Sequence, residues 1–173
     1  MKSEDRRRAL LALLHEETEP ISASALASRL GVSRQIIVGD VALLRSAGEK
    51  ITATPRGYLI NVDQPGLCCQ IAVCHRASEM EAELNAIVDN GCTVLDVIVE
   101  HPLYGQLTGQ LQLASRYEIG QFMQRCAQAE AHPLSNLTGG IHLHTLLCPD
   151  ENALLRVKDD LRELGILLED REG

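Results

Sequence analysis

Two histidines in the last quarter of the chain are the residues best suited to metal chemistry. His142 and His144 are two residues apart in the segment LTGGIHLHT. If this segment forms a β-strand, both imidazoles lie on the same face, because side chains alternate along a strand. Two imidazoles on one face form half of a transition-metal site. An isolated HxH pair, however, is more often a surface or packing feature than a metal site.

Two further residues could complete such a site. His75 ends the apolar run CQIAVCH, and Glu83 lies in the next segment, SEMEAELNAIVDN. The apolar residues of that segment recur at helical spacing, and Glu83 lies close enough to their stripe to point inward. His75, Glu83, His142 and His144 would together offer three imidazoles and one carboxylate. This set suits Ni, Zn, Fe or Mn.

Several interpretations of these ligands remain open. A metal-dependent hydrolase could use the same residues, but the sequence offers no well-supported general base or nucleophile beside them. We therefore expect a protein that is not an enzyme. A metal-responsive regulator, for which the ion itself is the effector, is the alternative. His101, in the segment VEHPLYG, would support or bind a ligand, or serve only the fold.

The elements that must position these residues alternate regularly after a short linker that contains Pro65 and Gly66. The pattern predicts strands at 69–75, 93–101, 104–113 and 140–148, and helices at 78–90, 115–130 and 151–164. The order βαββαβα indicates an open-faced sandwich of class α+β, with a mixed or antiparallel sheet and helices on one face. We expect this domain to span residues 69–173. If both histidines of the pair face the helices, Ile141 and Leu143 face away and could form a homodimer interface.

The front of the chain has the pattern of a winged helix-turn-helix domain, over residues 1–62. A first helix is predicted from about Ser3 to Glu17, with the basic residues 6–8 facing outward. Ser22 is expected to cap a second helix, Gly31 to make the tight turn, and Ser33 to cap a third helix. The segment EKITATPRGYLI then predicts a two-stranded wing. A helical protein-interaction module is the alternative for this part.

The third helix has an outer face suited to the major groove of double-stranded DNA. Its buried stripe consists of Ile37, Val41 and Leu44, which leaves small and hydrogen-bonding residues on the opposite side. The wing brings two basic residues close to the phosphate backbone. The predicted DNA-binding residues are Ser33, Arg34, Gln35, Val38, Arg45, Lys50 and Arg56.

Composition agrees with two domains that have different partners. Residues 1–62 carry nine basic and seven acidic side chains, whereas residues 63–173 carry seven and seventeen. Only the first part can favour phosphate. Aromatic residues make up 2% of the chain, which argues against stacking on single-stranded nucleic acid. No apolar stretch approaches the roughly 20 residues of a membrane helix, so we expect a cytoplasmic protein with its six cysteines reduced.

Several segments together resemble a known family over nearly the whole chain. These are SRQIIV in the third helix, HPLYG, SRYEI and the closing PLSNLTGGIHLHT. They are similar to the niacin-responsive transcriptional repressors, which join a winged helix to a three-histidine domain. The resemblance implies a dimeric regulatory domain that binds a divalent metal and senses nicotinic acid as co-repressor. The genes repressed in that family serve NAD synthesis or niacin uptake.

The resemblance also implies roles for particular residues. It gives His75, Glu83, His142 and His144 as the metal ligands. Nicotinate could reach open positions of the ion through its pyridine nitrogen or its carboxylate. The expected effector-binding residues are His101, Tyr104, Gly139 and Gly140, with the two glycines donating backbone N–H groups to the carboxylate.

Overall fold

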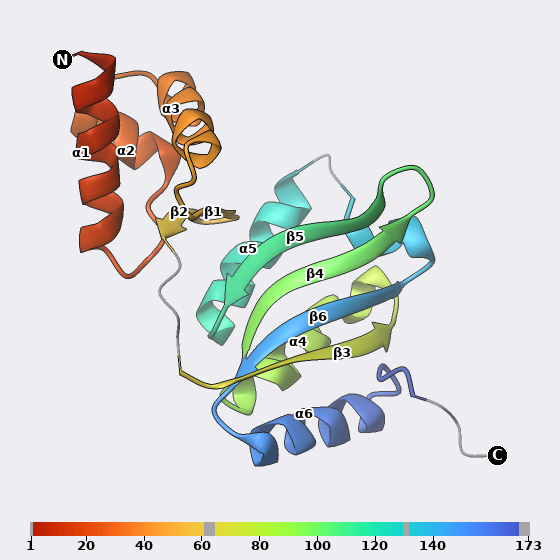
Figure 1. Cartoon of the computed structure of the whole chain (residues 1–173). Coiled ribbons are helices and arrows are strands. Elements are labelled where there is room, and N and C mark those ends of the chain that lie inside the picture. The colour runs from red at the N-terminus through yellow and green to blue at the C-terminus, as the bar shows by residue number, and fades with distance from the viewer. Residues whose placement is uncertain (1, 61–64, 130–131, 170–173) are drawn as a thin grey trace. The chain divides into compact units, whose positions relative to one another are not determined.

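The computed structural model describes residues 2–60, 65–129 and 132–169 and divides into two compact units, residues 1–63 and 64–173 (Figure 1). The domain boundary predicted at residue 62 lies outside the described residues. The predicted end of the 115–130 helix, residue 130, likewise lies outside them. No helix in the described part of the chain is long and apolar enough to cross a membrane.

The N-terminal unit is a three-helix domain followed by a β-hairpin. Its elements are α1 (Ser3–Glu16), α2 (Ala23–Leu30), α3 (Arg34–Ser46), β1 (Ile51–Thr54) and β2 (Gly57–Ile60). The side chain of Ser22 caps α2, and that of Ser33 caps α3. Gly31, between the two helices, has a φ of 66°, a conformation that favours glycine. The predicted helix-turn-helix and wing are therefore present.

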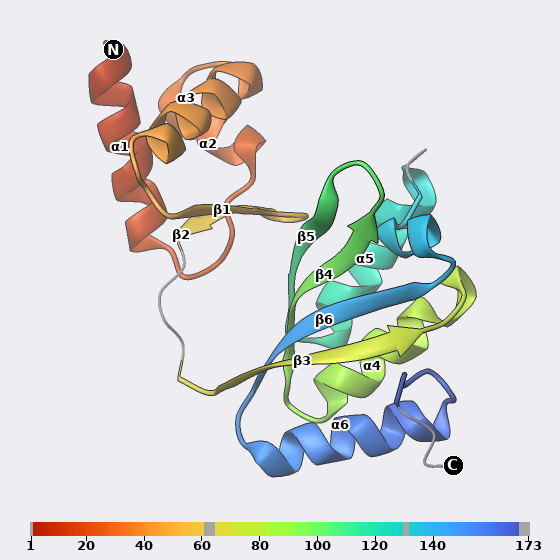
Figure 2. The ribbon, with the colours of Figure 1, turned by 45° about the vertical axis from the view of Figure 1, so that its right-hand side comes forward.

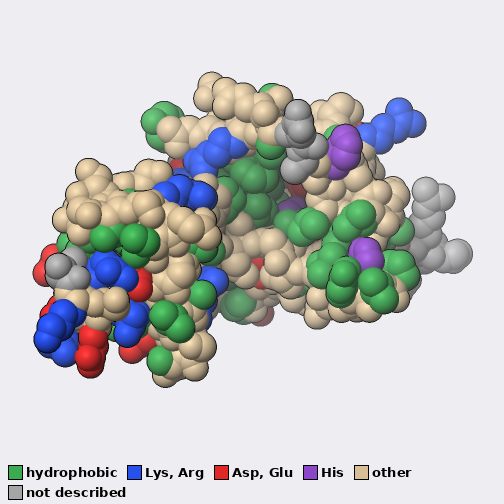
Figure 3. Space-filling view, turned by 90° about the horizontal axis from the view of Figure 1, so that it is seen from above, with side chains coloured by type: hydrophobic (Ala, Val, Ile, Leu, Met, Phe, Trp, Pro, Cys, Tyr) green, Lys and Arg blue, Asp and Glu red, His purple; other side chains and the backbone are tan. Residues whose placement is uncertain are grey.

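The packing of this unit includes an ion pair that the sequence does not reveal. We expected the basic residues 6–8 to face outward, and for two of them this is wrong. Asp40 of α3 is only 3% exposed and lies 2.6 Å from Arg6 Nε and 3.7 Å from Arg7 Nη1, both on α1. This buried carboxylate ties α3 to α1. Elsewhere on the unit, basic and acidic side chains are intermixed at the surface (Figure 3).

The C-terminal unit contains an antiparallel four-stranded sheet in the order β3-β6-β4-β5. The strands are β3 (Leu67–Cys74), β4 (Thr93–His101), β5 (Gly105–Leu113) and β6 (Ile141–Cys148). The helices are α4 (Met80–Asp89), α5 (Arg116–Gln128) and α6 (Glu151–Glu163), with short 3-10 helices η1 (Ala77–Glu79) and η2 (Leu134–Thr138). α4 contacts both α5 and α6, so the three helices form one layer (Figure 2). The predicted βαββαβα order is confirmed.

The core of this unit lies between the sheet and the helix layer. In β6 the buried residues are His142, His144, Leu146 and Cys148, alternating with more exposed ones. The side chains of Leu146 and Cys148 pack among apolar residues of all three helices. The two histidines continue the same inward row, so they enter the space between sheet and helices instead of facing solvent.

Candidate metal centre and DNA-binding surface

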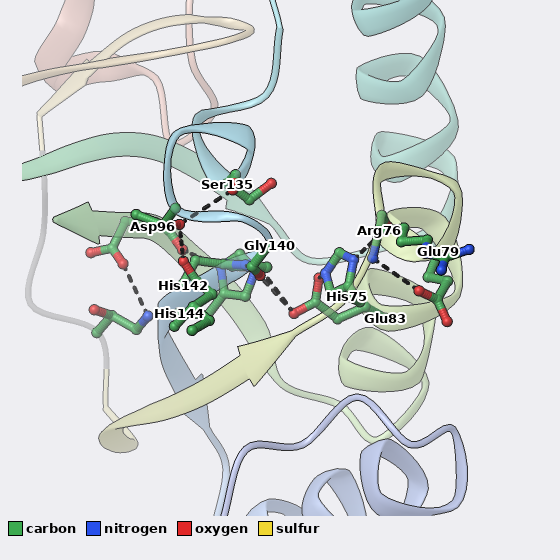
Figure 4. A network of polar contacts seen from close by, with 12 residues as sticks. His75, Arg76, Glu79, Glu83, Asp96, Ser135, Gly140, His142 and His144 are labelled. Carbon is green, nitrogen blue, oxygen red and sulfur yellow. Dashed lines mark hydrogen bonds and ion pairs between the residues drawn. The ribbon is translucent and has the colours of Figure 1, made fainter. Parts of the chain in front are cut away.

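Three elements bring the four predicted metal ligands together. His75 follows the last residue of β3, Glu83 lies in the first turn of α4, and the other two histidines lie on β6 (Figure 4). β3 and β6 are neighbouring strands, and Val73 pairs with His142. Glu83 points from the helix toward the sheet and is 0% exposed, although glutamate is rarely fully buried without a partner.

The carboxylate of Glu83 is the centre of the cluster. Its Oε2 atom lies 2.6 Å from His75 Nε2, and its Oε1 atom lies 3.2 Å from His144 Nε2 and 3.5 Å from His142 Nε2. All three imidazoles are buried as well. Despite their proximity, Glu83 Oε1 and His144 Nε2 make no hydrogen bond. These two buried polar atoms therefore lie close together without a hydrogen-bond partner among the described residues.

The Nδ1 atom of each imidazole lies close to a backbone carbonyl. The contacts run from His75 to Arg76 O (2.7 Å), from His142 to Gly140 O (2.9 Å), and from His144 to Asp96 O (2.6 Å). A carbonyl can only accept, so each Nδ1 carries the proton. In the neutral ring, Nε2 then has a free lone pair, and all three Nε2 atoms point toward the carboxylate. Such second contacts are typical of histidines that bind a metal.

The negative charge of Glu83 and the imidazoles of His75 and His144 shift one another's pKa values. Burial lowers the pKa of His75 and of His144, but Glu83 outweighs burial and raises both, through its hydrogen bond and negative charge at His75 and through its negative charge at His144. Burial raises the pKa of Glu83, yet the three imidazoles outweigh it, and this pKa lies well below its usual range. The carboxylate is thus matched by protonated imidazoles when no other cation is present.

The donor set fits a divalent transition metal. His75, Glu83 and His142 each offer a ligand atom, and these atoms lie within 4.8 Å of one another. His144 Nε2 approaches the same carboxylate. With neutral imidazoles the cluster consists only of acceptors, whose mutual repulsion a cation would relieve. Nitrogen and carboxylate donors suit Zn and its neighbours in the first transition row.

A cavity of about 190 Å³ adjoins the cluster, and all four of these side chains line it. The other walls are mostly apolar and come from α4, the sheet, α5 and the segment around η2: Met80, Leu84, Val97, Gly109, Leu111, Phe122, Cys126, Pro133, Leu134 and Ser135. Among the described residues that line it, none is lysine or arginine. The cavity can therefore hold a small, largely apolar molecule in contact with the metal cluster.

The structure places two of the four predicted effector-binding residues away from this cavity. His101 and Tyr104 lie at the β4–β5 turn, with ring centroids 5.0 Å apart. His101 Nδ1 accepts hydrogen bonds from the backbone of this turn, and Tyr104 is 70% exposed. Neither residue lines the cavity. Their part in effector binding stays a prediction.

The two predicted glycines lie next to the cluster, but their N–H groups bond to the protein backbone. The N–H groups of Gly139 and Gly140 both donate to the carbonyl of Ser135. A Cβ atom on Gly140 would lie 2.4 Å from the carbonyl oxygen of His75, so only glycine fits there. Gly140 O also accepts the Nδ1 proton of His142. Gly140 therefore contacts two of the histidines, because its carbonyl also accepts the backbone N–H of His75, whereas Gly139 bonds to Ser135.

The predicted DNA-binding residues lie on α3 and near the hairpin. Arg34 and Gln35 are exposed at the N-terminal end of α3, and Val38 is half-buried. The Ser33 hydroxyl accepts the backbone N–H of Ile36, so this residue also orients the helix start. An exposed helix start with Arg and Gln suits contacts to base edges in the major groove.

The other three predicted residues lie at the end of α3 and along the wing. Arg45 Nε donates to the carbonyl of Ile51 in β1 over 2.7 Å. Lys50 is exposed immediately before the hairpin. Arg56, in the hairpin turn, lies 3.0 Å from the carboxylate of Glu19. The exposed side chain of Lys50 is thus accessible to a phosphate.

Sequence reasoning missed the cavity walls and one support of the cluster. Phe122 carries no motif, and nothing in the segment PLSNLTGGIHLHT marks Leu134 and Ser135 as cavity walls, because only the fold brings them beside α4 and the sheet. The carbonyl of Asp96, which accepts the His144 proton, is equally invisible in the sequence. The one available signal was the position of Asp96 inside the apolar run TVLDVIV.

Comparisons with known proteins agree with this architecture. Residues 6–59 match a family of HTH domains, and residues 68–170 match the 3H domain family. The chain is 41% identical over 167 residues to the probable transcription repressor NiaR of Thermotoga maritima, covering 96% of this chain and 95% of the relative. It is also 41% identical over 171 residues to the transcription repressor NadR of Bacillus subtilis, covering 96% and 94%. The chain therefore belongs to the NiaR/NadR family of DNA-binding transcription repressors, which are not enzymes.

Proposed function

We propose that this repressor controls genes of NAD biosynthesis or niacin uptake in the cytoplasm, with nicotinic acid as its co-repressor. Residues 1–62 read double-stranded operator DNA, and residues 69–173 form the metal- and effector-binding regulatory domain. The single observation that carries the proposal is the buried cluster of three imidazoles and one carboxylate beside an apolar cavity.

His75, Glu83, His142 and His144 are the residues that would hold a divalent Ni, Zn, Fe or Mn ion. Their contribution is geometric, because the backbone carbonyls at Nδ1 fix each ring with its Nε2 lone pair toward the site. When bound, the ion would supply a positive charge that can accept a nitrogen or carboxylate ligand from a small molecule.

The cavity walls suit the ring of nicotinate, whereas its negative charge would need the metal ion. A flat pyridine ring can pack against Phe122 and Leu134, which lie among the apolar lining residues. Its carboxylate would meet no lysine or arginine among the described lining residues. Burying an unpaired carboxylate is expensive. Metal binding and nicotinate binding are therefore expected to depend on each other, and neutral nicotinamide should bind less tightly.

We propose a homodimer that pairs the sheet faces opposite the helices. Leu143 lies on this face, with Ala72 beside it on one neighbouring strand and Ile98 on the other. Ile141 of the same face is 50% exposed. An apolar sheet face of this kind favours association with a second copy. A dimer would present two copies of α3 to a two-fold symmetric operator.

Operator binding tests the proposal directly. DNA fragments selected by the full-length protein from a random pool, with Zn²⁺ or Ni²⁺ and nicotinate present, provide the probe for fluorescence anisotropy. We expect tight binding with metal and nicotinate together, and weak binding with chelator or with nicotinamide. Equal affinity in these three conditions contradicts the effector assignment. Affinity that follows the metal without nicotinate supports the metal-responsive alternative instead.

Two histidine variants complete the test. His142→Ala removes a ligand of the cluster, so operator binding should no longer respond to nicotinate. His132→Ala, an exposed histidine of the same domain, serves as the matched control and should respond as the wild type does. If both variants respond normally, the cluster is not the sensor.

A further inference from the structure

Strand β4 is irregular where it passes the metal cluster. Opposite β6, Val94 pairs with Leu146 and Ile98 pairs with Leu143. Four steps along β4 therefore match three steps along β6, which means that β4 carries one extra residue in this stretch. Such a bulge interrupts the regular ladder and can redirect backbone groups next to a functional site.

Asp96 lies within this irregular stretch and contacts β6 through two different atoms. Its carboxylate oxygen Oδ1 accepts the backbone N–H of Thr145 over 2.9 Å. Its backbone carbonyl accepts the Nδ1 proton of His144 over 2.6 Å. In a regular ladder a backbone carbonyl would accept the amide of the facing strand. Here the carboxylate accepts that amide, so the carbonyl of Asp96 is available to the imidazole.

The support of His144 differs in origin from that of the other two histidines. The acceptor of His75 is the carbonyl of the next residue, and the acceptor of His142 lies two residues before it in the same chain segment. The acceptor of His144 is 48 residues away on another strand. The orientation of this ring therefore depends on the bulge. Within the bulge, the side chain of Asp96 bonds to the backbone of β6.

We infer that Asp96 is the positioning residue of His144, acting through the bulge that its carboxylate stabilises. This inference rests on the proposed metal site and names a residue that holds one of its ligands in the binding orientation. With the carboxylate removed, the Thr145 amide loses its acceptor and the bulge is no longer favoured. The Asp96 carbonyl then moves away from His144, whose ring and proton position are no longer fixed.

Metal affinity of the full-length protein measures this effect. Zn²⁺ binding is determined by competition with a chromophoric chelator for the wild type, Asp96→Ala, Asp96→Asn and Glu100→Ala. We expect a loss of about 10- to 100-fold for Asp96→Ala, the range found when such supporting contacts are removed. Asparagine keeps an oxygen that accepts the Thr145 amide, so Asp96→Asn should remain within about threefold of wild type. Glu100 is exposed on the same strand, and Glu100→Ala controls for the lost negative charge.

The outcomes separate this inference from the proposed function. If the wild type binds no Zn²⁺, the proposed metal site fails. If the wild type binds and Asp96→Ala binds equally well, the site stands and the positioning role of Asp96 fails. Equal losses in Asp96→Ala and Asp96→Asn would assign the effect to charge and also overturn the inference.

An NMR signature tests the mechanism independently of affinity, on Zn²⁺-loaded protein. Long-range ¹⁵N–¹H spectra of the imidazoles should show a protonated, slowly exchanging Nδ1 on each of His75, His142 and His144 in the wild type. Asp96→Ala should lose this signal for His144 and keep the other two, which a general loss of structure would not do. If Asp96→Ala does not fold, Asp96→Asn decides: persistence of the His144 signal is expected, and its loss overturns the inference.

Discussion

The stabilisation of the regulatory domain by Zn²⁺ should increase steeply as the pH rises from 6 to 8. Glu83 raises the pKa of His75 and of His144, after outweighing the lowering by burial, so both rings carry an extra proton in the metal-free protein over a wider pH range. A metal requires the neutral rings. Binding therefore displaces up to two protons, and affinity rises by up to about 100-fold per pH unit while both are bound.

The stability that the histidines give to the metal-free protein changes with pH in the opposite direction. A raised histidine pKa stabilises the fold fully below the unfolded value of about 6.5, and this stabilisation is lost as the pH rises through the folded value. The lowered pKa of Glu83 stabilises above about 4.3, and that contribution is lost as the pH falls through the folded value. The metal-free cluster is thus most favourable at mildly acidic pH, whereas the metal-loaded cluster is most favourable above neutrality.

The expected size follows from ligand linkage. Zn²⁺ at 100 times its Kd at pH 8 adds about 2.7 kcal/mol to the free energy of unfolding. If two protons compete at pH 7, the Kd is about 100-fold weaker and the same Zn²⁺ concentration adds only about 0.4 kcal/mol. For a domain of this size the difference corresponds to roughly 10 °C in Tm.

Thermal unfolding followed by circular dichroism, with Zn²⁺ or chelator at pH 6, 7 and 8, measures this difference. Calorimetric titration in buffers of different ionisation enthalpy counts the released protons. His132→Ala should behave as the wild type, and His142→Ala should gain no stability from Zn²⁺. A Zn²⁺-induced gain in Tm that is constant or falls between pH 6 and 8, or a release of no protons at pH 6, refutes the reasoning.

Three further predictions address other parts of the chain. Lys50→Ala should weaken binding to all DNA sequences alike and reduce the slope of log affinity against log salt by about 1, measured by anisotropy at several salt concentrations. Phe122→Ala should weaken nicotinate binding about tenfold and leave Zn²⁺ affinity unchanged by calorimetry; loss of nicotinate binding in Tyr104→Ala alone would move the effector site to the β4–β5 turn. A disulfide reagent at pH 8 should label exposed Cys68 rapidly and Cys148 very slowly, since burial raises the pKa of Cys148 to about 12, and equal rates would contradict this.

The sequence predicted the elements well because their signals are local. Periods of 2 and 3.6 residues are set by strand and helix geometry, and the caps Ser22 and Ser33 act within one turn of their helices. The inward row of β6 follows from alternation, so the shared face of His142 and His144 was predictable. Glu83 was predictable for a similar reason, since it borders an apolar stripe.

The rest of the site depends on contacts between distant segments. Asp40 and its arginine partners look like solvated helix charges until α1 packs against α3. The walls of the cavity come from residues between Met80 and Ser135 on several elements of the chain. No spacing rule relates these residues. The glycines were expected to donate to the effector, but the fold directs both N–H groups to Ser135. In each case tertiary packing decides the partner, and local pattern does not.

The geometry of the cluster also bears on how one domain can require both an ion and a vitamin. The carboxylate of Glu83 contacts all three imidazoles and also lines the cavity, so the protein's own negative charge lies beside both the proposed metal position and the proposed effector position. A second carboxylate in the cavity would be repelled by Glu83 unless a cation lies between them. By linkage, any factor by which the ion strengthens nicotinate binding is the factor by which nicotinate strengthens retention of the ion. If the proposed ion and nicotinate both bind here, operator binding would depend on the concentrations of both, and removal of either ligand would weaken retention of the other.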